Sequence, residues 1–255
     1  MPQGKAVKIY VINLKKDLEK RQEMQAQLNL MALDAIFINA IHGRSLLDTS
    51  PNIASCLGLC APAQRPKELS PGELGCLLSH RLIWKEIAQK GQAAVVLEDD
   101  ALLGPDFAQL LPSLNELPQG VECLLLGHQR QIYPCGFRIE SPVYKKGQID
   151  FCNHKIARLI AGGNGAFAYF LRPKLAQEFL EAKYLAPADW YTSGLLSSTQ
   201  YALMPPSVSI APKYLLSSTT QSKQPKNRPL FSKLLKRFKN YLRFLPQSFM
   251  TPPST

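Results

Sequence analysis

The most informative stretch of this sequence is Ala93–Leu103, AAVVLEDDALL. Five small or apolar residues run directly into three carboxylates, Glu98, Asp99 and Asp100, after which the chain becomes apolar again. A short valine-rich run of this kind predicts a buried strand. A buried charge costs several kcal/mol unless a partner compensates it. Three acids at the end of a core strand therefore indicate a candidate binding site.

Strand and helix patterns alternate along the rest of the chain. Patterns rich in β-branched and aromatic residues predict strands at 6–13, 34–41, 93–100, 121–128, within 162–172, and at 201–210. Helix patterns lie at 18–30, from Ser70 to about residue 90, and from Pro173 onward; Ser70 and Glu73 form a capping box. Residues 48–69 lack clear periodicity and predict a loop with one short helix. Strand, helix, strand at this spacing predicts βαβ units, hence an α/β fold with a parallel sheet.

Positive charge is concentrated at the C-terminal end of the chain. The net charge is +11, but eight basic residues and no acid lie between Gln221 and Thr255, so the first 220 residues carry only +3. Within 230–245, apolar and basic residues alternate at helical spacing, which predicts an amphipathic helix on an anionic membrane surface. The alternative is a helix docked on its own domain or at a homodimer contact. We expect a folded domain at 1–211, a linker at 212–229 and this tail at 230–255.

The sequence also favours one compartment. Its first residues contain too short an apolar run for a signal peptide, and no run reaches the ~18 apolar residues needed to cross a bilayer. The six cysteines are scattered without CxxC pairs. We expect reduced thiols in a cytoplasmic protein that lies peripherally on a membrane.

The acidic triplet has the chemistry of a hard-cation site. On an extended chain Glu98 and Asp100 point the same way and Asp99 the opposite way. Converging carboxylate oxygens suit Mg²⁺ or Mn²⁺, which often complete their coordination with substrate phosphates. In open α/β sheets, ligands bind where parallel strands end. The alternative is a solvated acidic turn or a cluster of ion pairs.

Four motifs together resemble one known family. They are VINLKKDLEKR at 11–21, INAIHG at 38–43, LSPGELGCLLSHRLIW at 69–84 and VVLEDD at 95–100. In this order the motifs resemble glycosyltransferase family 25, which includes bacterial lipooligosaccharide galactosyltransferases, and the resemblance covers roughly residues 6 to 200. It implies a GT-A-like fold with a mixed, mostly parallel sheet flanked by helices. It also implies a UDP-sugar donor, a DxD-type metal site and inversion at the anomeric carbon.

The resemblance assigns roles to individual residues. Glu98 and Asp100 would be the ends of the DxD-type triplet, with Asp100 on the metal and Glu98 near the metal or the donor ribose. Further positions match motifs beside the nucleotide or donor: Asn13, Arg21, Gly43, Gly72, Glu73, Gly75, Ser79 and His80. Arg21 could instead be a surface charge, Glu73 a cap, and His80 a core histidine. His42 stands where many relatives carry Asp, which puts any role for it in doubt.

Transfer with inversion also needs a base. We predict that Asp189, in PADWY, takes the proton of the acceptor hydroxyl, with Asp99 and Glu73 as rivals. Asp189 could equally be a helix-capping or turn residue. His128, just past a strand, could complete the metal shell, or serve only the structure. Trp190 and Tyr191, next to Asp189, suit stacking on a sugar face, and core packing explains them nearly as well.

The predicted function is transfer of galactose, or secondly glucose, from a UDP-sugar to a lipooligosaccharide, with Mn²⁺ or Mg²⁺, at the cytoplasmic face of the bacterial inner membrane. The runner-up is another Mg²⁺-dependent phosphate enzyme, such as a nucleotidyltransferase. The non-enzymatic rival is a basic membrane or nucleic-acid adaptor, which leaves VVLEDD unexplained. We expect no nucleic-acid partner.

Overall fold

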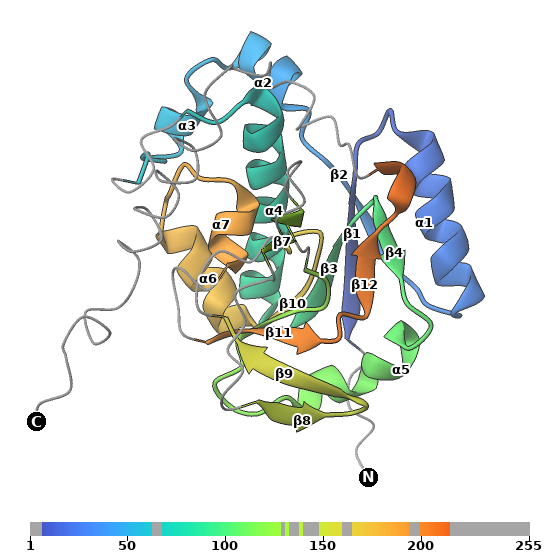
Figure 1. Cartoon of the computed structure of the whole chain (residues 1–255). Helices are drawn as coiled ribbons and strands as arrows, with labels where there is room; N and C mark the ends of the chain where they lie inside the picture. Colours follow the sequence, from blue (N-terminus) through green and yellow to red (C-terminus); the bar gives the residue numbers. More distant parts are fainter. Residues whose placement is uncertain are drawn as a thin grey trace, which may run out of the picture.

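An eight-stranded sheet lies at the centre of the computed structural model, with helices on both faces (Figure 1). The structure describes residues 7–62, 68–128, 131–132, 138–139, 148–159, 165–193 and 199–214. The strand order is β2-β1-β3-β10-β5-β11-β9-β8. The strands are β1 (Lys8–Asn13), β2 (Ile36–Asn39), β3 (Ala94–Glu98), β5 (Cys123–Leu125), β8 (Ile149–Phe151), β9 (His154–Arg158), β10 (Ala168–Leu171) and β11 (Gln200–Met204).

The predicted α/β class is confirmed, but the expectation of a mostly parallel sheet is wrong. The pairs β1–β2, β1–β3 and β5–β11 are parallel, whereas β10–β3, β10–β5, β11–β9 and β8–β9 are antiparallel. The reversal begins at β10, which lies between β3 and β5 and runs against both. The apolar composition of a central strand is the same in either direction, so the sequence pattern did not reveal this.

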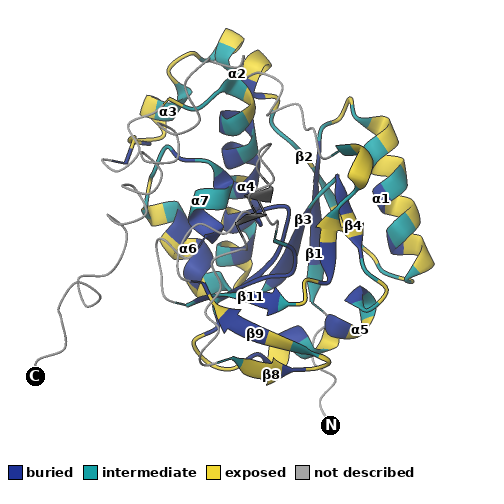
Figure 2. Cartoon of the chain, viewed as in Figure 1, coloured by how far each residue is buried: buried dark blue, intermediate teal, exposed yellow. Residues whose placement is uncertain are grey.

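Helices form a layer on each side of the sheet. On one face lie α1 (Leu18–Leu30) and α5 (Phe107–Leu110), followed by the 3₁₀ helix η1 (Pro112–Glu116); on the other lie α4 (Pro71–Lys90), α6 (Pro173–Glu181) and α7 (Ala188–Thr192) (Figure 1). Alternate β3 residues serve the two layers, since Val95 packs with α1 and Val96 with α4. The central strands are buried, as Figure 2 shows in dark blue.

Helix α4 starts as the sequence predicts. The Ser70 hydroxyl accepts a hydrogen bond from the Glu73 amide at 3.3 Å, and the Glu73 carboxylate accepts one from the Ser70 amide at 2.9 Å. Gly91 ends the helix in the left-handed conformation, at φ 58°. Both ends of this 20-residue helix are thus capped, and the helix packs along one face of the sheet.

Two short helices lie between β2 and α4, and the second of them, at 53–56, is the one short helix predicted within 48–69. They are α2 (Gly43–Thr49) and α3 (Ile53–Cys56). The start of α2 lies against α4: a Cβ added to Gly43 would come within 1.7 Å of the Pro71 carbonyl oxygen, and one added to Gly75 within 2.4 Å of the Ile41 carbonyl oxygen. Glycines at both positions therefore allow the two backbones to touch.

The end of the described chain lies against β4 and α1. Strand β12 (Val208–Ile210) pairs with β4 (Ala101–Leu103), away from the main sheet, so the predicted strand at 201–210 is two strands. The 3₁₀ helix η2 (Pro212–Tyr214) follows, and its Tyr214 hydroxyl donates to Glu23 on α1 at 3.0 Å. The first three residues of the predicted linker are thus bound to the domain. The rest of the linker and the tail at 230–255 lie outside the described residues. A separate two-stranded sheet joins β6 (Gln131–Ile132) and β7 (Arg138–Ile139).

Candidate active site

The acidic triplet lies at the carboxyl end of β3, between the two helical layers. Strand β3 ends at Glu98, and Asp99 and Asp100 form the turn that leads into β4. Because the strand does not continue, the predicted alternation through the triplet does not hold: Lys20 contacts both Asp99 and Asp100. Glu98 instead faces α4. The three neighbouring acids therefore serve two different sets of partners.

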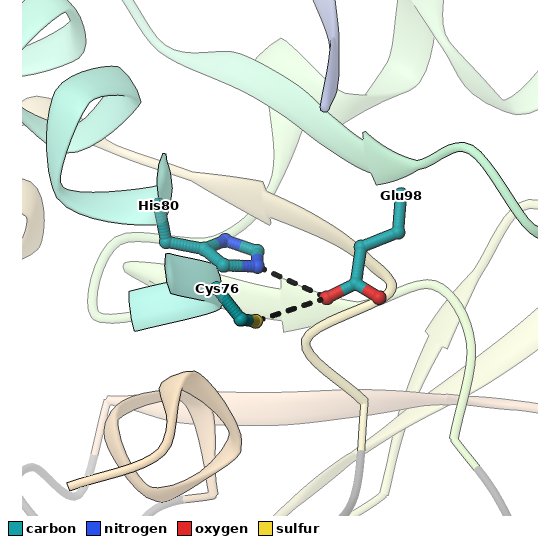
Figure 3. A group of neighbouring side chains, drawn as sticks. All are labelled: Cys76, His80 and Glu98. Carbon is teal, nitrogen blue, oxygen red and sulfur yellow. Dashed lines mark hydrogen bonds and ion pairs between the residues drawn. The ribbon is translucent and has the colours of Figure 1, made fainter. Parts of the chain in front are cut away.

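Glu98 is held by two residues one turn apart on α4. His80 Nε2 lies 3.1 Å from Glu98 Oε1, and Cys76 Sγ lies 3.6 Å from the same oxygen (Figure 3). Burial raises the pKa of Glu98, but the interaction with His80 outweighs burial, so the pKa lies below its usual value. The Cys76 thiol has the opposite shift, because burial and the charges of Glu98 and Asp189 raise its pKa well above the usual value. Glu98 is therefore an ionised carboxylate beside a protonated thiol.

Both carboxylate oxygens of Asp99 have partners, one on α1 and one at the end of β1. Its Oδ1 pairs with Lys20 Nζ at 2.9 Å, and its Oδ2 accepts a hydrogen bond from Asn13 Nδ2 at 2.8 Å. Burial still raises the pKa of Asp99 above its usual value, against the effect of Lys20. With both oxygens occupied, Asp99 is poorly suited to act as a base. Asn13, predicted to lie beside the nucleotide, thus contacts the acidic turn directly.

Asp100 has the least satisfied charge in this group. Its residue is only 7% exposed, and its Oδ1 is buried without a hydrogen-bond partner. Burial, with the charges of Glu98 and Asp99, raises its pKa from 3.8 to about 7, although Lys20, 3.7 Å from Oδ2, opposes the shift. Asn13 Oδ1 is a second buried oxygen without a partner. Buried oxygens in a negative environment are suited to a divalent cation, so the residues present fit the metal that the sequence implied.

Asp189 joins the same electrostatic environment from α7. Its Oδ1 accepts hydrogen bonds from the backbone amides of Gly165 at 3.1 Å and Ala166 at 3.0 Å. Burial raises its pKa above the usual value, and the charge of Glu98 adds to this effect. Asp189 therefore fixes the segment leading into β10, and a raised pKa makes its carboxylate a stronger base.

Other predicted residues are held by structural contacts. Ser79 is fully buried, and its hydroxyl donates to the Gly75 carbonyl and accepts from the Ile41 amide, at 2.7 and 2.8 Å. Gly43 belongs to the close contact between α2 and α4. Arg21 is exposed, with its guanidinium 4.2 Å from the centre of the Phe37 ring. These contacts give structural roles, and contact of these residues with a donor stays a prediction.

His128 is not part of a compact ligand set with the acids. Its Nε2 lies 2.9 Å from the Leu203 carbonyl oxygen. Among the described residues, three possible metal ligands come within 4.8 Å of one another only at Cys76, His80 and Glu98. The predicted combination of Glu98, Asp100 and His128 is therefore not preassembled.

Three residues from the sequence analysis remain: Tyr191 and Trp190, next to Asp189, and His42, at the start of α2. Tyr191 is fully buried and its ring lies 4.9 Å from that of Trp84, so core packing explains it. Trp190 is half-buried beside Tyr184, with ring centroids 5.4 Å apart. His42 is exposed and caps α2 without a side-chain bond to the helix amides. Trp190 thus remains the candidate for a sugar contact.

Three site residues escaped sequence reasoning. Lys20, the cation beside two of the acids, sits in a charged helix where it looks like a surface residue. Burial lowers the pKa of Lys20, but the charges of Asp100 and Asp99 outweigh burial, so the pKa lies above its usual value. In the sequence, Cys76 is one of six scattered cysteines, and Tyr169 lies in an apolar strand pattern. A signal was available for Cys76, because it precedes His80 by one helical turn.

Comparisons with known proteins show which family the chain belongs to. A family model described as "Glycosyltransferase family 25 (LPS biosynthesis protein)" matches residues 6–192, so the chain belongs to glycosyltransferase family 25. Similar proteins include a "Glycosyltransferase 25 family member" of Aedes aegypti, 32% identical over 130 residues that cover 48% of this chain and 21% of that protein. "Procollagen galactosyltransferase 1-B" of Xenopus laevis is 33% identical over 110 residues, covering 42% and 18%.

One similar protein carries a different description. "Probable inactive glycosyltransferase 25 family member 3" of Rattus norvegicus is 36% identical over 114 residues, covering 42% of this chain and 19% of that protein. The matched segments thus span about a fifth of the length of these relatives. Similarity of this degree is shared by proteins named as galactosyltransferases and as inactive. Any activity of this chain therefore depends on its own residues.

Proposed function

We propose that this member of glycosyltransferase family 25 transfers a hexose from a UDP-sugar to a lipooligosaccharide, with inversion and with a divalent cation at the end of β3. The observation that carries the proposal is the Asp100 carboxylate, which is buried among other acids and has one oxygen without a partner. A protein keeps such a group where a ligand compensates it. Relatives named as galactosyltransferases make UDP-galactose the first donor to test and UDP-glucose the second.

The residues divide into three tasks. Asp100, with Glu98 beside it, would hold Mn²⁺ or Mg²⁺, which neutralises a leaving diphosphate as a Lewis acid. Asp189 would accept the proton of the acceptor hydroxyl, a contribution of typically ~10²–10⁴-fold. It is better placed than Asp99, because both oxygens of Asp99 are already bonded to Lys20 and Asn13.

The family description and the tail sequence support the proposed acceptor and location. The description names lipopolysaccharide biosynthesis, and this supports a lipid-linked acceptor. The basic, amphipathic sequence at 230–245 would bind the cytoplasmic face of the bacterial inner membrane, where such an acceptor lies. Among the described residues, no helix has the length and apolar character needed to cross a bilayer.

The test is a screen for UDP release from UDP-galactose and UDP-glucose, with a truncated lipooligosaccharide or with procollagen as acceptor, and for pyrophosphate release from UTP. We expect turnover with UDP-galactose and lipooligosaccharide that EDTA abolishes and Mn²⁺ or Mg²⁺ restores. Asp100→Asn should reduce this turnover by about 10²–10³-fold. Asp150→Asn is the control. The Asp150 side chain is 86% exposed and forms an ion pair with Lys155, so its replacement should leave turnover unchanged. Release that continues in EDTA would contradict the cation, and turnover of UTP alone would favour a nucleotidyltransferase.

A further inference from the structure

A chain of hydrogen bonds connects the core to the acidic end of β3. Trp84 Nε1 donates to the Tyr169 hydroxyl oxygen at 2.8 Å, and that oxygen lies 2.9 Å from His80 Nδ1. His80 Nε2 in turn lies 3.1 Å from Glu98 Oε1 (Figure 3). Trp84, Tyr169 and His80 are each 0% exposed. Water is therefore excluded from all but the last link of this buried hydrogen-bond chain.

The donors and acceptors in the chain determine where the His80 proton lies. The indole nitrogen of Trp84 can only donate, so the Tyr169 oxygen accepts from it. The hydroxyl proton of Tyr169 must then find an acceptor, because an unpaired donor in a dry core is costly. Among the described residues, His80 Nδ1 is the acceptor within hydrogen-bond distance of that hydroxyl, so Nδ1 carries no proton. The neutral imidazole therefore has its proton on Nε2, facing the Glu98 carboxylate.

We infer that Tyr169 is a positioning residue, which fixes His80 as the Nε2–H tautomer and so holds the Glu98 carboxylate in one orientation. In the opposite tautomer, an Nε2 lone pair would face a carboxylate oxygen and repel it. The functional part of this inference rests on the proposed function, in which Glu98 lies at the cation and donor.

The orientation of Glu98 determines which oxygen a ligand can use. Both hydrogen bonds described above, from His80 and from Cys76, end on Oε1. Figure 3 shows the second oxygen pointing away from both donors. The Glu98 side chain is 29% exposed, whereas His80 is fully buried. Tyr169 thus leaves the second carboxylate oxygen of Glu98 without a bond to either His80 or Cys76.

A metal ion held by Cys76, His80 and Glu98 is the competing explanation of the same cluster. Such an ion would bind Nε2 through its lone pair, so this nitrogen could not carry a proton. Coordination and the tautomer proposed above therefore predict opposite states of one atom. Imidazole ¹⁵N chemical shifts distinguish a protonated nitrogen from one with a free or metal-bound lone pair.

The experiment is ¹⁵N NMR of the ring-labelled full chain in EDTA, at neutral pH, with the His80 signals assigned by their loss in His80→Gln. We expect a protonated Nε2 and an unprotonated Nδ1 in the wild type, and a mixture of tautomers in Tyr169→Phe. Tyr10→Phe is the matched control, because it removes the hydroxyl of another buried tyrosine, one that interacts with Lys90 at the far end of α4. It should leave the His80 signals unchanged.

The second readout is UDP release under saturating donor. Tyr169→Phe should lower kcat by about 10- to 100-fold, the usual effect of losing an outer-shell partner, and it should add little to the loss caused by His80→Gln, because both act through the same group. Tyr10→Phe should retain activity.

Two results would overturn the inference. One is a wild-type spectrum with Nδ1 protonated, with both nitrogens protonated, or with an unprotonated Nε2; this decides the matter even if Tyr169→Phe does not fold. The other is a Tyr169→Phe variant whose His80 signals match the wild type. If the spectra behave as expected but no variant or wild type releases UDP, the role of Tyr169 toward His80 stands and the proposed function fails.

Discussion

Asp100→Asn should be more stable than the wild type, by a margin that grows as the pH rises. The pKa of Asp100 is about 7 in the folded state, against an ordinary value of 3.8, chiefly because burial disfavours the charge. The folded state therefore binds this proton more tightly than the unfolded state does. Stability is consequently lost as the pH increases between these two values. Asn has nearly the same shape and carries no charge, so the variant escapes this loss.

The size of the effect follows from the shift. Each pH unit within the interval changes the free energy of unfolding by about 1.36 kcal/mol. From about pH 5.5 to about pH 8, only the part below the folded pKa counts, so the stability difference between Asp100→Asn and the wild type should widen by about 2 kcal/mol. Contributions from other groups largely cancel, because both proteins contain them.

The assay is urea unfolding in EDTA at several pH values, followed by tryptophan fluorescence. Asp150→Asn is the control, since its side chain is 86% exposed and its stability difference from the wild type should stay constant. A difference for Asp100→Asn that also stays constant with pH would refute the reasoning. It would mean that the Asp100 charge is already compensated in the folded protein.

Four further predictions concern other parts of the molecule. Gly75→Ala should lower the free energy of unfolding by about 1–3 kcal/mol, because its Cβ would lie 2.4 Å from the Ile41 carbonyl oxygen; an unchanged thermal midpoint would contradict the close contact. Asp189→Asn should reduce transfer by about 10²–10⁴-fold with little change in donor affinity, and full activity would assign the base elsewhere. Lys20→Met should lower stability at about pH 8 in urea unfolding, since removing the cation raises the pKa of the carboxyl groups it contacts and leaves their charges less compensated; equal stability would show that the ion pairs contribute nothing. Deletion of 222–255 should impair binding to anionic vesicles far more than it impairs UDP-sugar hydrolysis. Equal loss of both would indicate a docked structural helix.

Local signals in the sequence were sufficient for much of the fold. The helix Leu18–Leu30 has the predicted bounds, and the start of α4 follows from its capping box. These features depend on neighbouring residues alone. The direction of β10 does not, because it is set by the tertiary arrangement of the chain, and a buried strand has the same composition either way. The reversed direction of β10 produces its antiparallel pairs with β3 and β5.

The site shows the same division. The acids could be predicted, because charge after an apolar strand is unusual in itself. Lys20 could not, because a lysine in a polar helix acquires its role only when α1 folds against β3. Tyr169 was equally hidden, since its hydroxyl becomes important only beside Trp84 and His80. Partners brought together from distant segments carry no local pattern.

The central claim is that the buried acids at the end of β3 hold a divalent cation together with a nucleoside diphosphate. Calorimetric titration of Mn²⁺ into the full chain with saturating UDP tests it most directly. We predict one bound Mn²⁺ per chain in the wild type and in Asp150→Asn, and binding weakened at least about 10-fold in Asp100→Asn. Absence of Mn²⁺ binding in the wild type, or equal affinity in Asp100→Asn, would contradict the account.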